Sequence, residues 1–318
     1  MTLDRFERTL LGCLPMSFTI VPCRKEDIEV VRGLLTHPSL QGEFSMLTLP
    51  GVLEDVWEDP FADLELRWLA LVNGVPVGFL FTLVLPGAAH AWVMFRLGVL
   101  EPHRRQGIGT ALLRAALARL EEQRQARNIN EFCLSAWSPS ESAAGFASHH
   151  GFAHARTFWK MVRPLGSPPV AMWPAGIETR TFDGSEAALR DFTDAYNISF
   201  AEHYHYVAST FEDIQAFTRK RTFSPAGLML AYRGGRCVGY SRNAIRGREG
   251  EVALLGVVPE ARGIGLGRAL LRWGAAWLER MECTSIELGV DGENESALAL
   301  YRSEKFDVSR TREIWSRA

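Results

Sequence analysis

Residues 97–113 read LGVLEPHRRQGIGTALL, and residues 255–271 read LGVVPEARGIGLGRALL. Both stretches run from an apolar segment through a proline to an arginine and two glycines spaced R-x-x-G-x-G, and an amphipathic segment follows each. A strand, a glycine-rich loop and a helix form a cradle for phosphate, because glycine lets the backbone approach an anion and the first N–H groups of the helix point at it. Two copies in the same context indicate a duplicated domain.

Each copy taken alone has other interpretations. Many glycine-rich turns between a strand and a helix serve only the turn. A Rossmann dinucleotide site requires G-x-G-x-x-G directly after the first strand, with an acidic residue about 20 positions further on. Here an arginine-bearing linker separates strand from glycines, and neither copy has the lysine followed by Ser/Thr of a P-loop. The repetition therefore favours a phosphate cradle outside both of those classes.

The loop resembles the acyl-CoA pyrophosphate site of the GNAT N-acetyltransferases, which follows an apolar strand and reads R-x-x-G-x-G/A. That family often shows a second motif, N-x-x-A-x-x-L-Y-x-x-x-G-F, after the next strand. The second half matches this motif at Asn294, Ala297, Leu300, Tyr301 and Phe306, with Lys305 at the glycine position. The corresponding residues of the first half are Ser140, Ala143, Phe146, Ala147, Gly151 and Phe152. The resemblance covers nearly the whole chain, and its layout is similar to mycothiol synthase and related tandem acetyltransferases.

The resemblance implies two tandem GNAT-like domains of mixed α/β class, with acetyl-CoA as co-substrate. The CoA-binding residues expected in the second copy are Val257, Val258, Arg262, Gly263, Ile264, Gly265, Leu266, Gly267, Arg268 and Asn294. Those expected in the first copy are Val99, Arg104, Arg105, Gln106, Gly107, Ile108, Gly109 and Thr110. Backbone N–H groups near Val257 and Val258 are expected to pair with the pantetheine arm and to stabilise the oxyanion.

Acetyl transfer to an amine also needs proton transfer, because the ammonium must lose a proton and the leaving thiolate must meet a donor. Glu251 opens the strand before the second loop, where relatives such as histone acetyltransferases have a catalytic glutamate. The resemblance therefore implies Glu251 as the base, directly or through water, and Tyr301 as the acid that faces the leaving sulfur. A solvated carboxylate and an ordinary helix tyrosine are the simpler alternatives.

The two copies differ at these catalytic positions. Glu251 aligns with Met94, Asn294 with Ser140, and Tyr301 with Ala147. Methionine cannot accept a proton and alanine cannot donate one. We therefore expect catalysis in the second half, with a first half that holds acyl-CoA or only braces its partner.

The acceptor-binding face is the variable part of the family. In the second half the segment 200–206, FAEHYHY, supplies His203, Tyr204, His205 and Tyr206, which suit hydrogen bonds to a polar substrate. An exposed polar loop is the alternative. His203 and His205 are also the nearest approach to a metal-ligand pair, but the other histidines supply no clear third ligand, so the sequence predicts no metal site.

Composition limits the function classes. The 318 residues carry a net charge of −2, which gives no basic field for nucleic acid. Five scattered cysteines fit reduced thiols in the cytoplasm better than a disulfide framework. No apolar run reaches membrane-spanning length, and the acidic residues before the short apolar run in residues 1–16 argue against a signal peptide. Residues 1–16 are expected to be an N-terminal extension. The sequence leaves the oligomeric state open.

Local patterns predict the order of elements. The expected boundaries are domains at 17–162 and 177–318, joined by a Pro/Gly-rich linker at 163–176 that resists regular structure. In each half, apolar strands surround helices at fixed places, which favours a mixed sheet per domain with helices on both faces. Because lysine is costly in a left-handed conformation, we expect the helix before Lys305 to end with a geometry different from that of the family's glycine.

The sequence thus predicts an acyl-CoA-dependent N-acetyltransferase that acts on the primary amine of a small molecule or a terminal amine. The alternative from another class is a non-catalytic acyl-CoA-binding regulatory module. A nucleotide-binding oxidoreductase is a more distant alternative.

Overall fold

The structure is a computed structural model that describes residues 17–58, 64–87, 89–137, 141–166 and 170–318. The expected extension 1–16, Ser140 and the centre of the expected linker lie outside these residues.

Both halves have helices at the same three points, after the first, fourth and fifth strands. The strands of the first half are β1 (Phe18–Pro22), β2 (Trp68–Val72), β3 (Val75–Leu85), β4 (Ala91–Val99), β5 (Ile129–Trp137) and β6 (Ala153–Arg163). Its helices are α1 (Ile28–Leu35), α2 (Pro38–Phe44), α3 (Val52–Trp57), α4 (Ile108–Gln123) and α5 (Glu141–His149). The strands of the second half are β7 (Glu178–Thr181), β8 (Leu228–Arg233), β9 (Arg236–Arg246), β10 (Glu249–Val257), β11 (Ser285–Asp291) and β12 (Asp307–Arg317). Its helices are α6 (Glu186–Phe200), α7 (Phe211–Thr218), α8 (Leu266–Arg280) and α9 (Glu295–Ser303).

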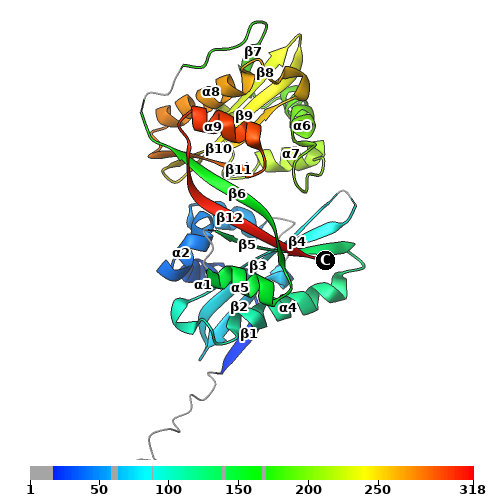
Figure 1. Cartoon of the computed structure of the whole chain (residues 1–318), viewed down its shortest axis with the longest axis vertical. Helices are drawn as coiled ribbons and strands as arrows, with labels where there is room; N and C mark the ends of the chain where they lie inside the picture. The colour runs from blue at the N-terminus through cyan, green and yellow to red at the C-terminus, as the bar shows by residue number, and fades with distance from the viewer. Residues whose placement is uncertain (1–16, 59–63, 88, 138–140, 167–169) are drawn as a thin grey trace, which may run out of the picture.

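All twelve strands form one sheet, in the order β1-β2-β3-β4-β5-β12-β6-β11-β10-β9-β8-β7. The last strand of each half is therefore exchanged: β12 pairs with β5, and β6 pairs with β11. Figure 1 shows β6 and β12 crossing side by side between the two halves. The mixed α/β class and the two copies are confirmed, but the expectation of a separate sheet per half is wrong.

The exchanged strands also enter the core of the opposite half. Trp315 of β12 packs in the cluster that includes Phe95 and Leu112 of the first half. Met161 of β6 is fully buried beside Leu278 of α8 in the second half. The exchange therefore unites the two halves through buried apolar surface as well as backbone hydrogen bonds.

Short-range signals explain most of the predicted elements. The β2–β3 hairpin turns at Asn73 and Gly74, whose φ angles of 51° and 79° fit a type I′ turn. Helix α7 begins with a capping box, in which Thr210 Oγ1 accepts from the Asp213 amide at 3.1 Å and the Thr210 amide donates to the Asp213 carboxylate at 2.8 Å.

Helices cover both faces of the sheet in the second half. Tyr240 on β9 hydrogen-bonds to Ser199 of α6 at 3.0 Å, whereas its neighbour Ser241 lies against Gly274 of α8. Because successive strand residues point to opposite faces, α6 and α8 lie on opposite sides. Trp277 of α8 is buried and Trp273 packs against the same cluster, so both tryptophans belong to the core.

Strands β10 and β11 separate toward the end of β10 that leads into the second loop. β10 runs in parallel register with β11 over Glu249–Glu251, and continues along β9 to Val257. This separation opens a space between β10 and β11 in front of α8.

Two further features bear on the predictions. The expectation for Lys305 is wrong, because its φ of 66° is left-handed like that of the family's glycine. Among the described residues, no helix is both long and apolar enough to span a bilayer.

Candidate active site

The second glycine-rich loop presents an open backbone at the start of α8. Gly263 and Gly265 have φ angles of 77° and 89°, and Gly265 is the N-cap residue of α8. A Cβ added at either glycine would meet no atom within 4 Å. Since the first N–H groups of a helix have no partner within it, this loop can cradle a phosphate.

The arginine of the motif points back into the protein in both copies. Arg262 donates to the carbonyl oxygens of Val257 at 3.2 Å and Ser199 at 3.4 Å. Arg104 donates in the same way to Val99 at 2.9 Å and Ser39 at 2.8 Å. The guanidinium group therefore fastens the loop to the end of the preceding strand, and the phosphate cradle consists of backbone N–H groups.

A cleft of about 750 Å³ extends from this loop past the ends of β10 and β11. The predicted residues that line it are Val257, Arg262, Gly263, Gly265, Leu266, Gly267, Arg268, Asn294, Tyr301 and His203. Of the predicted CoA-binding and catalytic residues of the second half, three lie elsewhere. Ile264 is exposed on the loop, Val258 is fully buried with its amide donating to Val238 at 3.1 Å, and Glu251 lies further back on β10. The Val258 amide is therefore already used, which leaves the backbone up to Val257 to meet a ligand.

Tyr301 of α9 lines the cleft and is 8% exposed. Burial raises the pKa of its hydroxyl to about 12. The phenol therefore stays protonated at neutral pH and is a hydrogen-bond donor toward the cleft. Asn294 supports it indirectly, because its side chain caps α9 by accepting from the Ala297 amide at 3.0 Å.

Glu251 is held by an ion pair rather than aimed freely into the cleft. Its carboxylate accepts from Arg246 Nε at 2.7 Å, and both side chains are about one-fifth exposed, at 23% and 17%. Glu251 is therefore not among the residues that line the cleft.

The four predicted residues of the acceptor segment, residues 200–206, make different contacts. His203 lines the cleft, and burial lowers the pKa of its imidazole, so it is neutral at pH 7. Tyr204 lies beneath the Arg156 guanidinium, 5.1 Å from its ring centre. Tyr206 donates to Asn197 at 2.5 Å and so ties the segment to α6. His205 faces the first half, where it meets Glu131.

Sequence reasoning missed a group of polar and charged side chains that lines the cleft. Arg156 of β6 binds Asp291 of β11 through two nitrogens, at 3.0 and 2.8 Å, and both side chains line the cleft with Glu202 and Ser199. No local pattern could place Arg156 here, because β6 belongs to the first half in sequence. Asp291 ends its strand at Gly292, and that strand-end carboxylate was the available signal.

The first copy preserves the loop and changes its surroundings. Gly107 has a φ of 82° and starts α4, as Gly265 starts α8. Ile108 is buried, and a Cβ on Gly109 would touch Phe146 at 3.4 Å. Gln106 donates to Pro102 at 3.1 Å, and Thr110 meets His150 at 3.1 Å. Where the second copy has Glu251 and Tyr301, the first has buried Met94 and Ala147.

Comparisons with known proteins agree with this geometry. The model of the acetyltransferase (GNAT) family matches residues 35–152 and 186–306. A protein named mycothiol acetyltransferase from Thermomonospora curvata is 35% identical over 243 residues, which cover 74% of this chain and 76% of that one. A mycothiol acetyltransferase from Pseudarthrobacter chlorophenolicus is 34% identical over 277 residues, covering 82% and 77%.

Solved structures share the fold. A GCN5-related N-acetyltransferase from Sphaerobacter thermophilus superposes with a TM-score of 0.75 at 24% identity, over 94% of this chain and 95% of that one. A tandem GNAT protein from the clavulanic acid biosynthesis pathway superposes with a TM-score of 0.71 at 17% identity, over 95% and 98%. With two matched segments, a shared tandem fold and a cleft at the second loop, the chain belongs to the GNAT family of N-acetyltransferases as a tandem member similar to mycothiol acetyltransferases.

Proposed function

We propose that this enzyme transfers the acetyl group of acetyl-CoA to the primary amine of a small molecule, in the cleft of its second half. The acceptor we expect is the cysteine amine of a cysteine–sugar conjugate, as for mycothiol synthase. The observation that carries the proposal is that one cleft joins the open loop at Gly263 and Gly265 to the buried hydroxyl of Tyr301. The similarity to proteins named mycothiol acetyltransferase supports the choice of acceptor.

Different groups in the cleft act at different steps of the reaction. The loop amides hold the pyrophosphate, and the backbone of β10 up to Val257 stabilises the oxyanion that forms when the amine attacks the thioester carbon. The attack forms the C–N bond, and the C–S bond breaks when the oxyanion collapses to the amide carbonyl and expels the CoA thiolate, which takes its proton from solvent. The Tyr301 hydroxyl then donates a hydrogen bond to the departing thiolate. A phenol with a pKa of about 12 gives up its proton reluctantly, so we expect it to stabilise the sulfur charge mainly as a donor.

The acceptor ammonium must lose a proton before the amine can attack. We expect it to pass through water to Glu251, as the resemblance to histone acetyltransferases suggests. The Asp291 carboxylate in the cleft attracts the cationic acceptor, while Arg156 holds Asp291 in place.

The two loops offer a matched test of where catalysis occurs. Gly265→Val and Gly107→Val replace glycines with nearly the same φ, 89° and 82°, and with open space around each. Both variants therefore suffer similar backbone strain. We expect Gly265→Val to lower the CoA affinity of the second site at least about tenfold and to abolish most turnover, whereas Gly107→Val keeps most turnover. CoA release with a cysteine–sugar conjugate and calorimetric CoA titration measure the two effects.

Thermal unfolding of both variants serves as the control for folding. Loss of turnover in folded Gly107→Val, with the second site still filled, would contradict the assignment of chemistry to the second half. If CoA binds but no amine in a broad panel releases free thiol, the chain is instead a non-catalytic acyl-CoA-binding module.

A further inference from the structure

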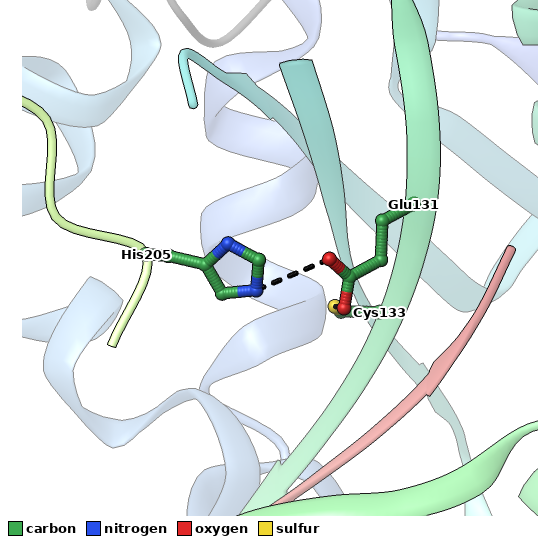
Figure 2. A group of neighbouring side chains, drawn as sticks. All are labelled: Glu131, Cys133 and His205. Carbon is green, nitrogen blue, oxygen red and sulfur yellow. Dashed lines mark hydrogen bonds and ion pairs between the residues drawn. The ribbon is translucent and has the colours of Figure 1, made fainter. Parts of the chain in front are cut away.

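Three side chains of metal-ligand type meet outside the cleft, at the junction of the two halves. Glu131 and Cys133 belong to β5, and His205 belongs to the segment between α6 and α7. His205 Nε2 lies 3.2 Å from one Glu131 oxygen, and Cys133 Sγ lies 3.6 Å from the other. The three ligand atoms lie within 4.8 Å of one another. Figure 2 shows the imidazole and the thiol converging on the carboxylate.

We propose that Glu131, Cys133 and His205 bind a divalent transition-metal ion, of which Zn²⁺ fits best. A thiolate with an imidazole selects a borderline or soft ion over Mg²⁺ or Ca²⁺, and a carboxylate completes common zinc sets. Zinc bonds of about 2.0–2.3 Å at tetrahedral angles put neighbouring ligand atoms about 3.3–3.8 Å apart. The two separations to Glu131 are close to this range, so small side-chain shifts would admit the ion.

The surrounding structure holds the three ligands in place. Glu131 and Cys133 are two residues apart on one strand, so their side chains point to the same face. His205 has a left-handed φ of 54°, and its ring stacks on Trp92 of β4 with centres 4.5 Å apart. Ligands held by strand pairing and ring stacking lose less conformational entropy on binding an ion than ligands on a free loop would.

Burial also suits a metal site. Cys133 is fully buried, whereas the side chains of Glu131 and His205 are 19% and 17% exposed. The group therefore has an apolar wall behind the sulfur and an approach from solvent past the other two ligands. Three protein ligands leave a fourth tetrahedral position for water.

Metal binding would fasten the acceptor segment to the first half. His205 and cleft-lining His203 are two residues apart in the same segment, so an ion on Glu131 and Cys133 would fix that wall of the cleft relative to β5. Sequence reasoning singled out His205 with His203 and predicted no metal site, because Glu131 and Cys133 lie in the other half of the chain. The proposal does not depend on acetyl transfer.

The test uses the full-length chain without an affinity tag, stripped of metal and titrated with Co²⁺. We expect one equivalent to give a sulfur-to-cobalt charge-transfer band and the visible bands of a four-coordinate ion, and Zn²⁺ to displace it. Cys133→Ala should remove the charge-transfer band. Glu131→Gln and His205→Asn should each weaken Co²⁺ binding at least about tenfold, and asparagine suits the left-handed backbone at position 205.

The matched control is Cys237→Ala, which removes another buried thiol far from this group in the fold and should keep both the band and the affinity. Circular dichroism and thermal unfolding check that each variant is folded. The proposal is overturned if excess Co²⁺ gives no thiolate band with the unaltered chain. It is equally overturned if the band survives Cys133→Ala, or if folded Glu131→Gln and His205→Asn bind as tightly as the unaltered chain.

Discussion

Two pairs of equivalent residues share a left-handed backbone but not a glycine. Gly263 in the second loop has a φ of 77°, and its counterpart Arg105 in the first has 61°. After the C-terminal helix motif, Gly151 has 76° in the first half and Lys305 has 66° in the second. Each copy therefore has the left-handed backbone with a glycine at one of the two sites and without one at the other, which indicates that the surrounding fold dictates the conformation at both sites.

This conservation of shape predicts a stability change at position 305. A non-glycine residue in the left-handed region costs about 1–2 kcal/mol, part of which glycine returns through the entropy of the unfolded chain. We expect Lys305→Gly to raise the free energy of unfolding by about 0.5–1 kcal/mol, measured by urea denaturation. The reciprocal Gly151→Lys should lower it by a similar amount. If Lys305→Gly is destabilising, contacts of the lysine side chain outweigh the strain.

The hydroxyl of Tyr301 allows a test that leaves the packing intact. Tyr301→Phe keeps the buried ring and deletes only the donor that faces the cleft. If the hydroxyl stabilises the leaving sulfur, turnover should fall about 10²–10⁴-fold, while the CoA dissociation constant measured by calorimetry changes little. Because the pKa of the phenol is raised to about 12, the unaltered enzyme should show no loss of activity from this group below that pH. Wild-type turnover in the variant would mean that water serves the sulfur instead.

Residue-level prediction succeeded where a residue's role is local. The glycines of the loops, the Thr210 cap and the Asn73–Gly74 turn follow from backbone chemistry that the sequence displays. The orientation of Arg262 was not visible, because its partners at Val257 and Ser199 come from other elements.

At the scale of elements, the open question is which one delivers the base. Strand β10 carries Glu251, paired with Arg246 of β9, behind the cleft. The segment after α6 carries His203 directly into the cleft, and burial lowers its pKa from the ordinary value of 6.5. The two residues would give the reaction different pH dependences.

We expect Glu251 to be the base. Glu251→Gln should lower kcat about 10²–10⁴-fold, whereas His203→Gln should chiefly raise the KM for the acceptor amine. The pH profile of kcat separates the two assignments. If His203 were the base, activity of the unaltered enzyme would fall as pH drops through its depressed pKa below 6.5, and His203→Gln would remove that acid limb. A large loss of kcat in His203→Gln with little change in Glu251→Gln would reverse our assignment.

Secondary-structure elements could be predicted from the sequence where their signals lie within a short stretch of residues. Strands and helices with clear apolar periodicity, such as β10 and α8, can be predicted from the sequence alone. β6 and β12 were not predicted, because their polar and apolar residues alternate weakly and their partners belong to the opposite half. The acceptor end of the site was missed for the same reason, since Arg156 lies on β6.

At the scale of the whole molecule, the exchange of β6 and β12 makes each half depend on the other. The proposed domain boundaries, 17–162 and 177–318, divide the sequence repeat, yet Trp315 completes the core of the first half. Cutting at those boundaries would therefore remove from each half the strand that the other half contributes to it.

A truncation after Phe306 tests this dependence. Removing residues 307–318 takes β12 from between β5 and β6 and exposes both edges. We expect unfolding of the first half as well as the second to become less cooperative, with loss of several kcal/mol of stability from the buried Trp315 and Ile314 alone. Hydrogen exchange resolved by segment should show β5 losing protection. A peptide of residues 307–318 added in trans should restore part of it, and unchanged protection of β5 would contradict the role of β12.

The position of β12 also constrains how the chain is made. Ribosomes release a protein from its N-terminus onward, and domains usually fold in that order. The first half of this protein cannot close its sheet until residues 307–317 are synthesised, because they supply the strand beside β5. During translation the edge of β5 therefore stays without its β12 partner until the end of the second half is synthesised. The β6 segment is also synthesised before β11, the strand with which it pairs. This arrangement makes the synthesis of β12, rather than completion of the first repeat, the event that permits the first half to close its sheet.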